Sequence, residues 1–381
     1  MLFLNFNNIS MRRIISLFLL ALFLNSCAVT RNIENDTIQL TFLDEYVLPS
    51  DTKFDNTVVG GLSGIDYKNG KYYLVSDQAS NPRIYEANIS IERQKFQNVS
   101  IEKLIKVKKT EKFTNEVLDL EALRFDELRD EFVVTSEGKI DEGKNPGIYR
   151  LSNNGEIQSS FTIPEYFKAE GEQKPRNNGV FEGLTESFDQ QGYWVATESP
   201  LEKDSSKPKI FPSRSHVRIT KFDKNTGEPT KQFVYKLDGI AKLPINYFAV
   251  NGLTEIIEYA EDKFLILERS YSAGYGSHGN TVKIFEVDAS KADNTLNLGK
   301  LKGEDYEAAE KKLLFNFKSV KNKLTRGIID NIEGMCFGPI LENGKHSLIL
   351  VSDNNFNSFA DQINQFIIME INIKNLTSKT N

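Results

Sequence analysis

Phe181-Glu-Gly-Leu-Thr-Glu-Ser-Phe188, followed after a short turn by Gly192-Tyr-Trp-Val-Ala-Thr-Glu198, is the stretch of sequence that decides the fold. It joins an acid, a glycine and an apolar residue to a turn and to an apolar strand that ends in a second acid. Four further segments repeat this pattern, and a repeat at a roughly regular period indicates a repeat architecture. These segments span residues 61–77, 120–137, 250–269 and 332–353.

A third stretch with alternating apolar residues follows each copy, which is typical of a β-strand. These stretches are 82–89, 147–151, 217–222, 281–287 and 365–371. Fourth strands are predicted at 101–107, 157–163, 231–237 and 312–317. Turn signals such as Lys68-Asn69-Gly70 separate them. Four antiparallel strands per repeat predict an all-β fold, a β-propeller of five or six four-stranded blades.

The ends of the repeat array leave two questions open. The last copy lacks an evident fourth strand, which the segment Thr37 to Leu48 would supply, closing the ring. The stretch 288–330 could hold a degenerate sixth blade, and Glu304 to Lys312, rich in helix formers, predicts a short helix. Lys168 to Asn178 and Leu201 to Ser215 are predicted to be long surface loops. A two-sheet β-sandwich is the alternative architecture, but it would not explain five matched motifs.

The N-terminus has the pattern of a secretory signal peptide. Arg12 and Arg13 precede a short apolar run at 14–24, and Leu24-Asn25-Ser26-Cys27 resembles the bacterial lipobox. We therefore expect a lipoprotein signal peptide at 1–27 with lipidation at Cys27, a tether at 28–36 and the propeller at 37–381. The alternative is an ordinary signal peptide with a coincidental cysteine. The predicted location is the bacterial cell envelope, lipid-anchored, in the periplasm or at the outer membrane.

Composition restricts the chemistry of any site. The net charge is -6, which argues against a dedicated nucleic-acid binder. Only two cysteines and three histidines are present, so a cysteine-built zinc site or a multi-histidine metal centre is not expected. With Cys27 lipidated, Cys336 is interpreted as a small buried residue in an apolar stretch. Any metal site would use oxygen ligands.

The repeated acids and amides provide those ligands. The first strand of a propeller blade lines the central channel, so one polar side chain from each copy should converge there: Ser63, Glu121, Glu182, Asn251 and Glu333. The acids that end the second strands should form a wider set: Asp77, Glu137, Glu198, Glu268 and Asp353. Buried carboxylates at close range require a cation, arginine partners or water. We predict a divalent cation, with Ca²⁺ favoured, held by Glu121, Glu182, Asn251 and Glu333.

The alternative for these acids is structural. An acid at equivalent blade positions often caps a turn or pairs with an arginine, and several arginines are suitably placed: Arg83, Arg124, Arg150, Arg218 and Arg269.

The loop from Glu268 to Asn280 is the least strand-like segment of its repeat. Its glycines permit close approach of a ligand, and Arg269, Tyr271 and His278 are predicted to bind substrate. The alternative is a flexible hairpin loop. Because the chain lacks a nucleophile elbow, a P-loop and a dinucleotide fingerprint, hydrolysis would use a water activated by a divalent cation, with a glutamate as base. The predicted catalytic residues are Glu182, Glu333 and Arg269.

As a set, these motifs resemble the phytase-like family described as "esterase-like activity of phytase", over roughly residues 40 to 373. The segments that carry the resemblance are 61–65, 75–77, 119–123, 177–184, Glu198, 251–255, 267–269, 332–335 and 351–354. The resemblance implies hydrolysis of phosphate or carboxyl esters.

The leading hypothesis is thus an envelope-anchored, metal-dependent hydrolase of phosphate or other esters. We expect a monomer that contacts the membrane through its lipid anchor, binds a small ester or phosphate compound and binds no nucleic acid. One alternative is a non-catalytic propeller that binds a small ligand or a protein at the cell envelope. Another is a lactonase-type sugar-acid hydrolase with one calcium in the channel.

Overall fold

The computed structural model describes residues 38–211, 213–356 and 362–373. The predicted signal peptide, the lipidated Cys27 and the tether lie outside these residues. Residues Ile38–Asn381 form a compact unit separate from Met1–Thr37. Every strand described below comes from this unit, so it contains all that the fold requires. Within the described residues, no helix has the length and apolar character needed to cross a bilayer.

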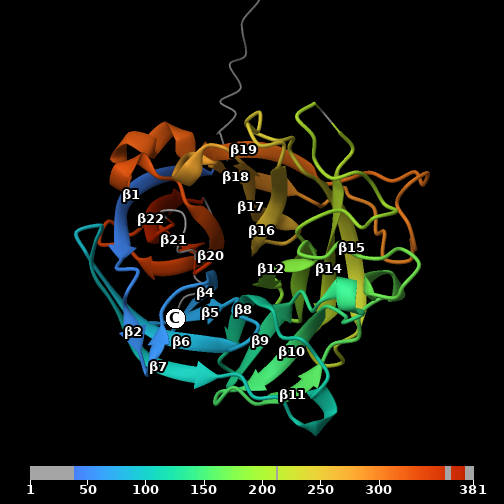
Figure 1. Cartoon of the computed structure of the whole chain (residues 1–381), viewed down its shortest axis with the longest axis horizontal. Helices are drawn as coiled ribbons and strands as arrows, with labels where there is room; N and C mark the ends of the chain where they lie inside the picture. Colours follow the sequence, from blue (N-terminus) through green and yellow to red (C-terminus); the bar gives the residue numbers. More distant parts are fainter. Residues whose placement is uncertain (1–37, 212, 357–361, 374–381) are drawn as a thin grey trace, which may run out of the picture. The chain divides into compact units, whose positions relative to one another are not determined.

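The described strands form five antiparallel four-stranded sheets around a central axis, and these sheets are the blades of a β-propeller (Figure 1). From the innermost strand outward, blade 1 holds β4 (Leu62–Lys68), β5 (Lys71–Ser76), β6 (Arg83–Glu92) and β7 (Lys95–Lys106). Blade 2 holds β8 (Leu120–Asp126), β9 (Glu131–Ser136), β10 (Gly147–Ser152) and β11 (Ile157–Ser160). Blade 3 holds β12 (Phe181–Glu186), β13 (Gly192–Thr197), β14 (His216–Asp223) and β15 (Pro229–Lys236). Blade 4 holds β16 (Ala249–Ala260), β17 (Lys263–Ser272), β18 (Asn280–Asp288) and β19 (Glu310–Asn316).

Blade 5 closes the ring. Its inner strands are β20 (Asn331–Ile340), β21 (His346–Asp353) and β22 (Asn364–Asn372), and its outer strand is β1 (Gln39–Leu48) from the other end of the unit. β1 pairs with β22 from Gln39 opposite Asn372 to Leu48 opposite Asn364, so the blue strand lies beside the red one in Figure 1. The predicted closure by the segment before the first copy is confirmed.

Short elements complete the fold. A two-stranded ribbon joins β2 (Lys53–Phe54) to β3 (Thr57–Val58). The 3₁₀ helices are η1 (Glu111–Phe113), η2 (Ile140–Glu142), η3 (Glu165–Phe167), η4 (Gly276–His278), η5 (Phe317–Lys323) and η6 (Thr325–Gly327). The β4–β5 hairpin turns at Asn69 and Gly70, both with positive φ (51° and 78°), as a two-residue turn of the predicted kind requires.

For 288–330, the structure decides between five and six blades in favour of five, and the predicted short helix is wrong. The described residues form five blades, and this stretch contributes one strand, β19, to blade 4. The segment before β19 covers the outer edge of blade 3, where Thr295 N donates to Gln232 O at 2.9 Å and Ala309 N to Val234 O at 2.9 Å. Here extended chain covers the strand edge, which would otherwise be open to pairing with another chain. The helix predicted at Glu304 to Lys312 is absent, because its last residues pair with β18 as part of β19.

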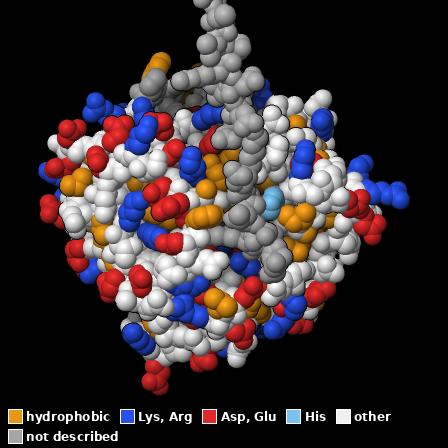
Figure 2. All heavy atoms as spheres, turned by 180° about the vertical axis from the view of Figure 1, so that it is seen from behind, with side chains coloured by type: hydrophobic (Ala, Val, Ile, Leu, Met, Phe, Trp, Pro, Cys, Tyr) orange, Lys and Arg blue, Asp and Glu red, His pale blue; other side chains and the backbone are white. Residues whose placement is uncertain are grey.

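Apolar side chains pack between adjacent blades. One cluster joins blades 4 and 5 through Leu267, Ile284, Met335 and Leu350, all 0% exposed. Cys336 is a free, buried thiol in the cluster between blades 5 and 1, as expected. Figure 2 shows Lys and Arg side chains interspersed with Asp and Glu over the visible face, which agrees with a small net charge. The ring is therefore held together by the apolar cores between adjacent blades.

Candidate functional site

A β-bulge near the start of each innermost strand positions the site. The pairing register shifts between Leu62 and Gly64, Leu120 and Leu123, Phe181 and Gly183, Leu253 and Glu255, and Ile332 and Gly334. A bulge leaves one residue unpaired and re-aims its side chain. The bulges contain Ser63, Glu121, Glu182, Thr254 and Glu333. The sequence motif is thus the signature of a bulge.

The glycine of the motif has a packing role. A Cβ on Gly64 would lie 2.8 Å from the carbonyl oxygen of Glu121 in the next blade. A Cβ on Gly334 would lie 3.0 Å from the Cα of Gly64. Innermost strands of adjacent blades therefore approach to distances that only glycine permits. This close approach brings the bulge side chains of different blades together.

The second strands end beside the bulges. Asp77 N donates to Gly61 O at 2.9 Å, Glu137 N to Asp119 O at 2.9 Å and Glu198 N to Val180 O at 2.8 Å. Asp353 holds the same place in blade 5, opposite Asn331. The acids predicted from four of the five copies therefore lie at equivalent positions, next to the bulge acids rather than in a separate, wider ring.

Blade 4 differs from the alignment of the motifs. The bulge residue of this blade is Thr254, three residues after the predicted Asn251. In the other blades the terminal acid lies opposite the residue two positions before the bulge. In blade 4 that residue is Gly252, and it lies opposite Arg269 rather than Glu268. Arg269 thus occupies the position that an acid holds in the other four blades. Thr254 is 2% exposed, and its Oγ1 has no hydrogen-bond partner among the described residues.

Eight carboxylates and one guanidinium form the resulting group, which we call the carboxylate cluster. Its acids are Asp77, Asp119, Glu121, Glu137, Glu182, Glu198, Glu333 and Asp353, and its cation is Arg269. Glu121 is close enough to Glu182 and Glu137, and Asp77 to Glu333, for mutual repulsion. The cluster lies where the innermost strands begin and the second strands end.

Burial is the main cause of the raised pKa values in this cluster, and repulsion between acids adds to it. The pKa of Asp77 is raised to about 7 and that of Asp119 to about 6. The pKa values of Glu137 and Glu333 are raised to about 8. The pKa values of Glu121 and Glu182 are also raised well above the usual range. Without a bound cation, part of the cluster is protonated near neutral pH.

Asp119, Glu121 and Glu137 form the tightest part of the cluster. One oxygen from each lies within 4.8 Å of the others, an arrangement that could hold a metal ion. Three carboxylates suit a hard cation such as Ca²⁺ or Mg²⁺. Glu137 is held in place because its Oε1 accepts the Val180 N–H at 2.5 Å. Asp119 was not among the predicted ligands, although its position two residues before Glu121 on an extended segment was a signal for it.

Arg269 provides the positive charge. Its Nη2 lies 2.8 Å from Glu333 Oε1 and 3.6 Å from Glu198 Oε1. Burial disfavours its charge, but Glu333, Glu198 and Glu182 keep the pKa of Arg269 above its ordinary value. Its Nε has no hydrogen-bond partner among the described residues. Arg83 near Asp77, Lys139 near Asp119 and Lys207 near Glu198 add positive charge, but these four basic side chains cannot neutralise eight acids.

Other predicted site residues lie elsewhere. Asn251 Nδ2 donates to Glu268 Oε2 at 2.7 Å and to Asp238 O at 3.0 Å, inside blade 4. Glu268 also accepts from Tyr235 and Lys311. The structure therefore brings together three of the four predicted metal ligands, Glu121, Glu182 and Glu333.

The predicted substrate-binding residues are divided in the same way. Arg269 lies in the cluster. Tyr271 is half-buried, with its ring centroid 6.3 Å from that of Phe248. His278 is exposed in η4, and its carbonyl oxygen accepts from Lys242 Nζ at 2.6 Å.

The other arginines considered as partners for the acids serve the framework. Arg218 pairs with Asp204 at 2.7 Å and Arg150 with Glu131 at 2.6 Å, both away from the axis. Arg124 crosses the channel, where it pairs with Glu255 at 3.0 Å and donates to Ile65 O at 3.1 Å. Arg83 donates to Gln78 Oε1 at 2.7 Å, and it lies close enough to Asp77 to attract that carboxylate. The structural interpretation of the motif acids therefore holds for Arg269, which pairs with Glu333 and Glu198, and for the attraction between Arg83 and Asp77.

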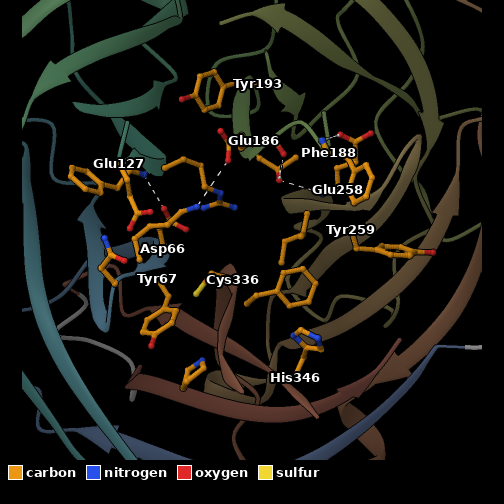
Figure 3. A pocket seen from close by; sticks show the side chains of 18 of the residues that line it. Asp66, Tyr67, Glu127, Glu186, Phe188, Tyr193, Glu258, Tyr259, Cys336 and His346 are labelled. Carbon is orange, nitrogen blue, oxygen red and sulfur yellow. Dashed lines mark hydrogen bonds and ion pairs between the residues drawn. The ribbon is translucent and has the colours of Figure 1, made fainter. Parts of the chain in front are cut away.

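A cavity of about 340 Å³ lies at the opposite mouth of the channel (Figure 3). Residues from the far ends of the innermost strands line it, including Asp66, Tyr67, Glu258, Tyr259 and Cys336. Arg124 also borders it, so the Arg124–Glu255 pair lies between this cavity and the carboxylate cluster along the innermost strands. The predicted catalytic and metal-ligating residues do not line this cavity.

Comparison with known proteins gives one family. The family model described as "Phytase-like: Esterase-like activity of phytase" matches residues 57–356. No curated protein sequence matches the chain.

Some solved structures are similar to the chain at low identity and low TM-score. An exo-1,5-α-L-arabinanase from a bovine ruminal metagenomic library is 11% identical, with 85% of this chain and 97% of that chain covered and a TM-score of 0.45. An endo-1,4-β-xylanase from Bacteroides thetaiotaomicron is 9% identical, with 81% and 90% covered and a TM-score of 0.44. A luciferin-regenerating enzyme is 11% identical, with 83% and 78% covered and a TM-score of 0.36. At these identities and scores the likeness bears on neither substrate nor activity.

Proposed function

The chain belongs to the phytase-like family described by esterase-like activity of phytase, and on that premise we propose that it is a hydrolase of phosphate or other esters whose reactive site is the carboxylate cluster. The observation that carries the proposal is the approach of Asp119, Glu121 and Glu137 to within 4.8 Å of one another. They lie among five further acids, and the basic side chains near the cluster are too few to balance this negative charge. So many buried carboxylates are costly without a cation.

The residues fit a divalent cation, with Ca²⁺ favoured because it accepts several carboxylates in flexible geometry. Asp119, Glu121 and Glu137 would hold it. Such a cation would polarise a phosphoryl or carbonyl oxygen of the substrate. Its identity and presence are part of the proposal.

The remaining cluster residues supply proton transfer and charge. Glu182 and Glu333 have raised pKa values, the latter about 8, so each can hold or release a proton near neutral pH. One of them would act as the base that takes a proton from the attacking water. Arg269 would bind the anionic part of the substrate, exchanging its contact with Glu333 for one with the ligand.

The test combines metal analysis with a substrate panel. The purified chain is examined for bound metal, then assayed on p-nitrophenyl phosphate and p-nitrophenyl acyl esters with Ca²⁺ and with EDTA. Glu121→Gln and Glu137→Gln should each weaken Ca²⁺ binding by more than about tenfold and abolish turnover. The matched control is Glu261→Gln, an exposed acid in the turn between β16 and β17. Turnover that EDTA leaves unchanged would contradict the metal, and Ca²⁺ binding without turnover of either ester class would favour a ligand-binding propeller.

The location belongs to the same proposal. A lipid anchor at Cys27 would place the site at the bacterial cell envelope, where it would act as a monomer on small esters and bind no nucleic acid. Cys27→Ser should then abolish labelling of the protein by radioactive palmitate in growing cells, a readout that other contacts with the membrane do not change. Labelling of the variant equal to that of the parent would contradict lipidation at Cys27.

A further inference from the structure

Most of the exposed large apolar side chains gather on three loops around the mouth that holds the carboxylate cluster. The loops are 205–215, 239–248 and 273–279, which lead from β13 to β14, from β15 to β16 and from β17 to β18. They carry seven of the eleven exposed large hydrophobic residues in the described part of the chain. We call these seven the apolar platform: Ile210, Phe211, Leu243, Ile245, Tyr247, Phe248 and Tyr275. A contiguous apolar surface of this kind marks an interaction site.

The loops are braced against one another. Ile245 N donates to Ala273 O at 2.9 Å, and Ala273 N donates to Phe248 O at 2.9 Å. Tyr275 Oη donates to Leu243 O at 2.8 Å, and Ile240 N to Lys209 O at 2.9 Å. These hydrogen bonds hold the backbones of the three loops together, so the platform residues project from one connected set of loops.

Tyr247 is the most exposed aromatic residue of the platform. Its side chain is 98% exposed, and its backbone φ is 57°, in the left-handed region that bulky residues rarely adopt. Because the Tyr247 side chain is almost fully exposed, no packing contact in the unbound protein offsets the cost of this backbone conformation. A strained backbone that holds an aromatic ring in solvent points to a bound state in which the ring is covered.

The charge of the three loops favours an anionic partner. The platform segments 205–215, 239–248 and 273–279 contain Lys207, Lys209, Arg214 and Lys242 but no Asp or Glu. The rest of the same connections, 198–204 and 237–238, carries four acids. Of these, Glu198 and Asp204 are buried, and Asp238 pairs with Lys283 and Lys311. Glu202 is thus the one that remains exposed and outside the ion pairs of the described residues. On η5, Lys318 and Lys321 are close enough to Lys242 to repel it. Apolar and aromatic tips flanked by Lys and Arg are the features with which proteins bind the interface of anionic membranes.

We propose that the apolar platform binds the surface of an anionic lipid bilayer. β16 and β17 run directly from these loops to Gly252 and Arg269, so a docked bilayer would face the mouth with the carboxylate cluster. Lys207 is close enough to Glu198 to attract it, which places one platform lysine near that mouth. The proposal does not depend on what the cluster hydrolyses.

Vesicle sedimentation tests the proposal. The chain from Ile38 onward, which contains the whole ring, is used so that residues 1–37 contribute nothing. It should sediment with vesicles of phosphatidylcholine and phosphatidylglycerol, and less with phosphatidylcholine alone. The triple substitution Phe211→Ser, Tyr247→Ser and Phe248→Ser should weaken binding at least about tenfold. All three side chains are more than half exposed, so the variant should keep the circular dichroism of the parent.

The matched control is Leu128→Ser. Leu128 is 90% exposed in the β8–β9 turn at the opposite end of the ring, and its substitution should leave vesicle binding unchanged. An equal loss for both variants would overturn the proposal, because it would indicate nonspecific apolar sticking. Absence of binding by the parent at every lipid composition would also overturn it and leave the platform to a protein partner.

Discussion

Arg269 is the residue on which the charge balance of the axis depends. It replaces an acid at one of five equivalent positions and pairs with Glu333 and Glu198. Because a buried charge left without its partner is strongly unfavourable, the arginine stabilises the ring even where no cation is bound. The same residue is proposed to bind substrate, so a substitution of Arg269 should affect both the stability of the ring and the activity.

Replacing Arg269 with Gln should lower the free energy of unfolding by about 3 kcal/mol in EDTA. Calcium should restore part of the loss, because a bound cation would replace the missing charge. Urea unfolding with and without Ca²⁺ measures both effects. Lys168→Gln, which removes an exposed pair with Glu165, is the control and should cost less than about 1 kcal/mol. Equal losses for both variants would contradict a central role for Arg269.

Gly64 provides a second test at this scale. A methyl group there would lie 2.8 Å from the carbonyl oxygen of Glu121, so Gly64→Ala should force adjacent blades apart and cost about 1–3 kcal/mol. Gly299→Ala is the control, because nothing lies within 4 Å of the added Cβ. Thermal unfolding of both variants would show the difference. A fully stable Gly64→Ala protein would mean that the innermost strands can separate without cost.

At the scale of elements, the bulges of β4, β8, β12, β16 and β20 convert a repeated motif into converging side chains. The repeats, the closing strand and the buried Cys336 were predictable, because alternation and turn chemistry are local properties of the sequence. The register of blade 4 could not be predicted from the sequence. Asn251 and Thr254 are both polar residues close to a glycine in the motif, and only the pairing of β16 with β17 shows that Thr254 is the bulge residue. The helix predicted at Glu304 to Lys312 failed because pairing with β18 outweighs weak helix propensity.

The closing strand β1 should be essential for the ring. A chain that begins at Pro49 lacks β1 and exposes the edge of β22 together with apolar residues that pack against Leu40 and Phe42. We expect it to aggregate or to unfold without a cooperative transition, whereas a chain that begins at Ile38 should unfold in one step. Size-exclusion chromatography and thermal unfolding compare the two. A monomeric, cooperative chain from Pro49 would contradict this role for β1.

At the scale of the whole molecule, the cluster couples folding to pH. Its acids have higher pKa values in the folded chain than in an unfolded one, near 7 for Asp77 and 8 for Glu137 and Glu333. At a pH between the pKa values of these acids in the unfolded chain and those in the folded chain, the folded state binds more protons than the unfolded state. The free energy of unfolding therefore falls as the pH rises through this range.

In EDTA the protein should lose more than about 2 kcal/mol of stability between about pH 5 and about pH 8. Calcium should reduce this loss, because the cation competes with protons for the same oxygens. Urea unfolding at the two pH values with EDTA or Ca²⁺ provides the measurement. The double variant Glu121→Gln, Glu137→Gln should flatten the dependence. A stability that increases with pH in EDTA would contradict the raised pKa values.

The pairing of β1 with β22 also means that the ring can close only after nearly all of it has been synthesised. β1 leaves the ribosome before the other strands of the ring, and its partner β22 is the last of the described strands to be made. At synthesis rates of about 5–20 residues per second, the wait is on the order of tens of seconds. During that interval the backbone N–H and C=O groups of β1 have no partner strand. They can therefore pair with a strand of another chain, which leads to aggregation. During synthesis β1 is thus the strand of the ring that is exposed to aggregation for the longest time, and a chaperone that binds β1 would prevent this aggregation.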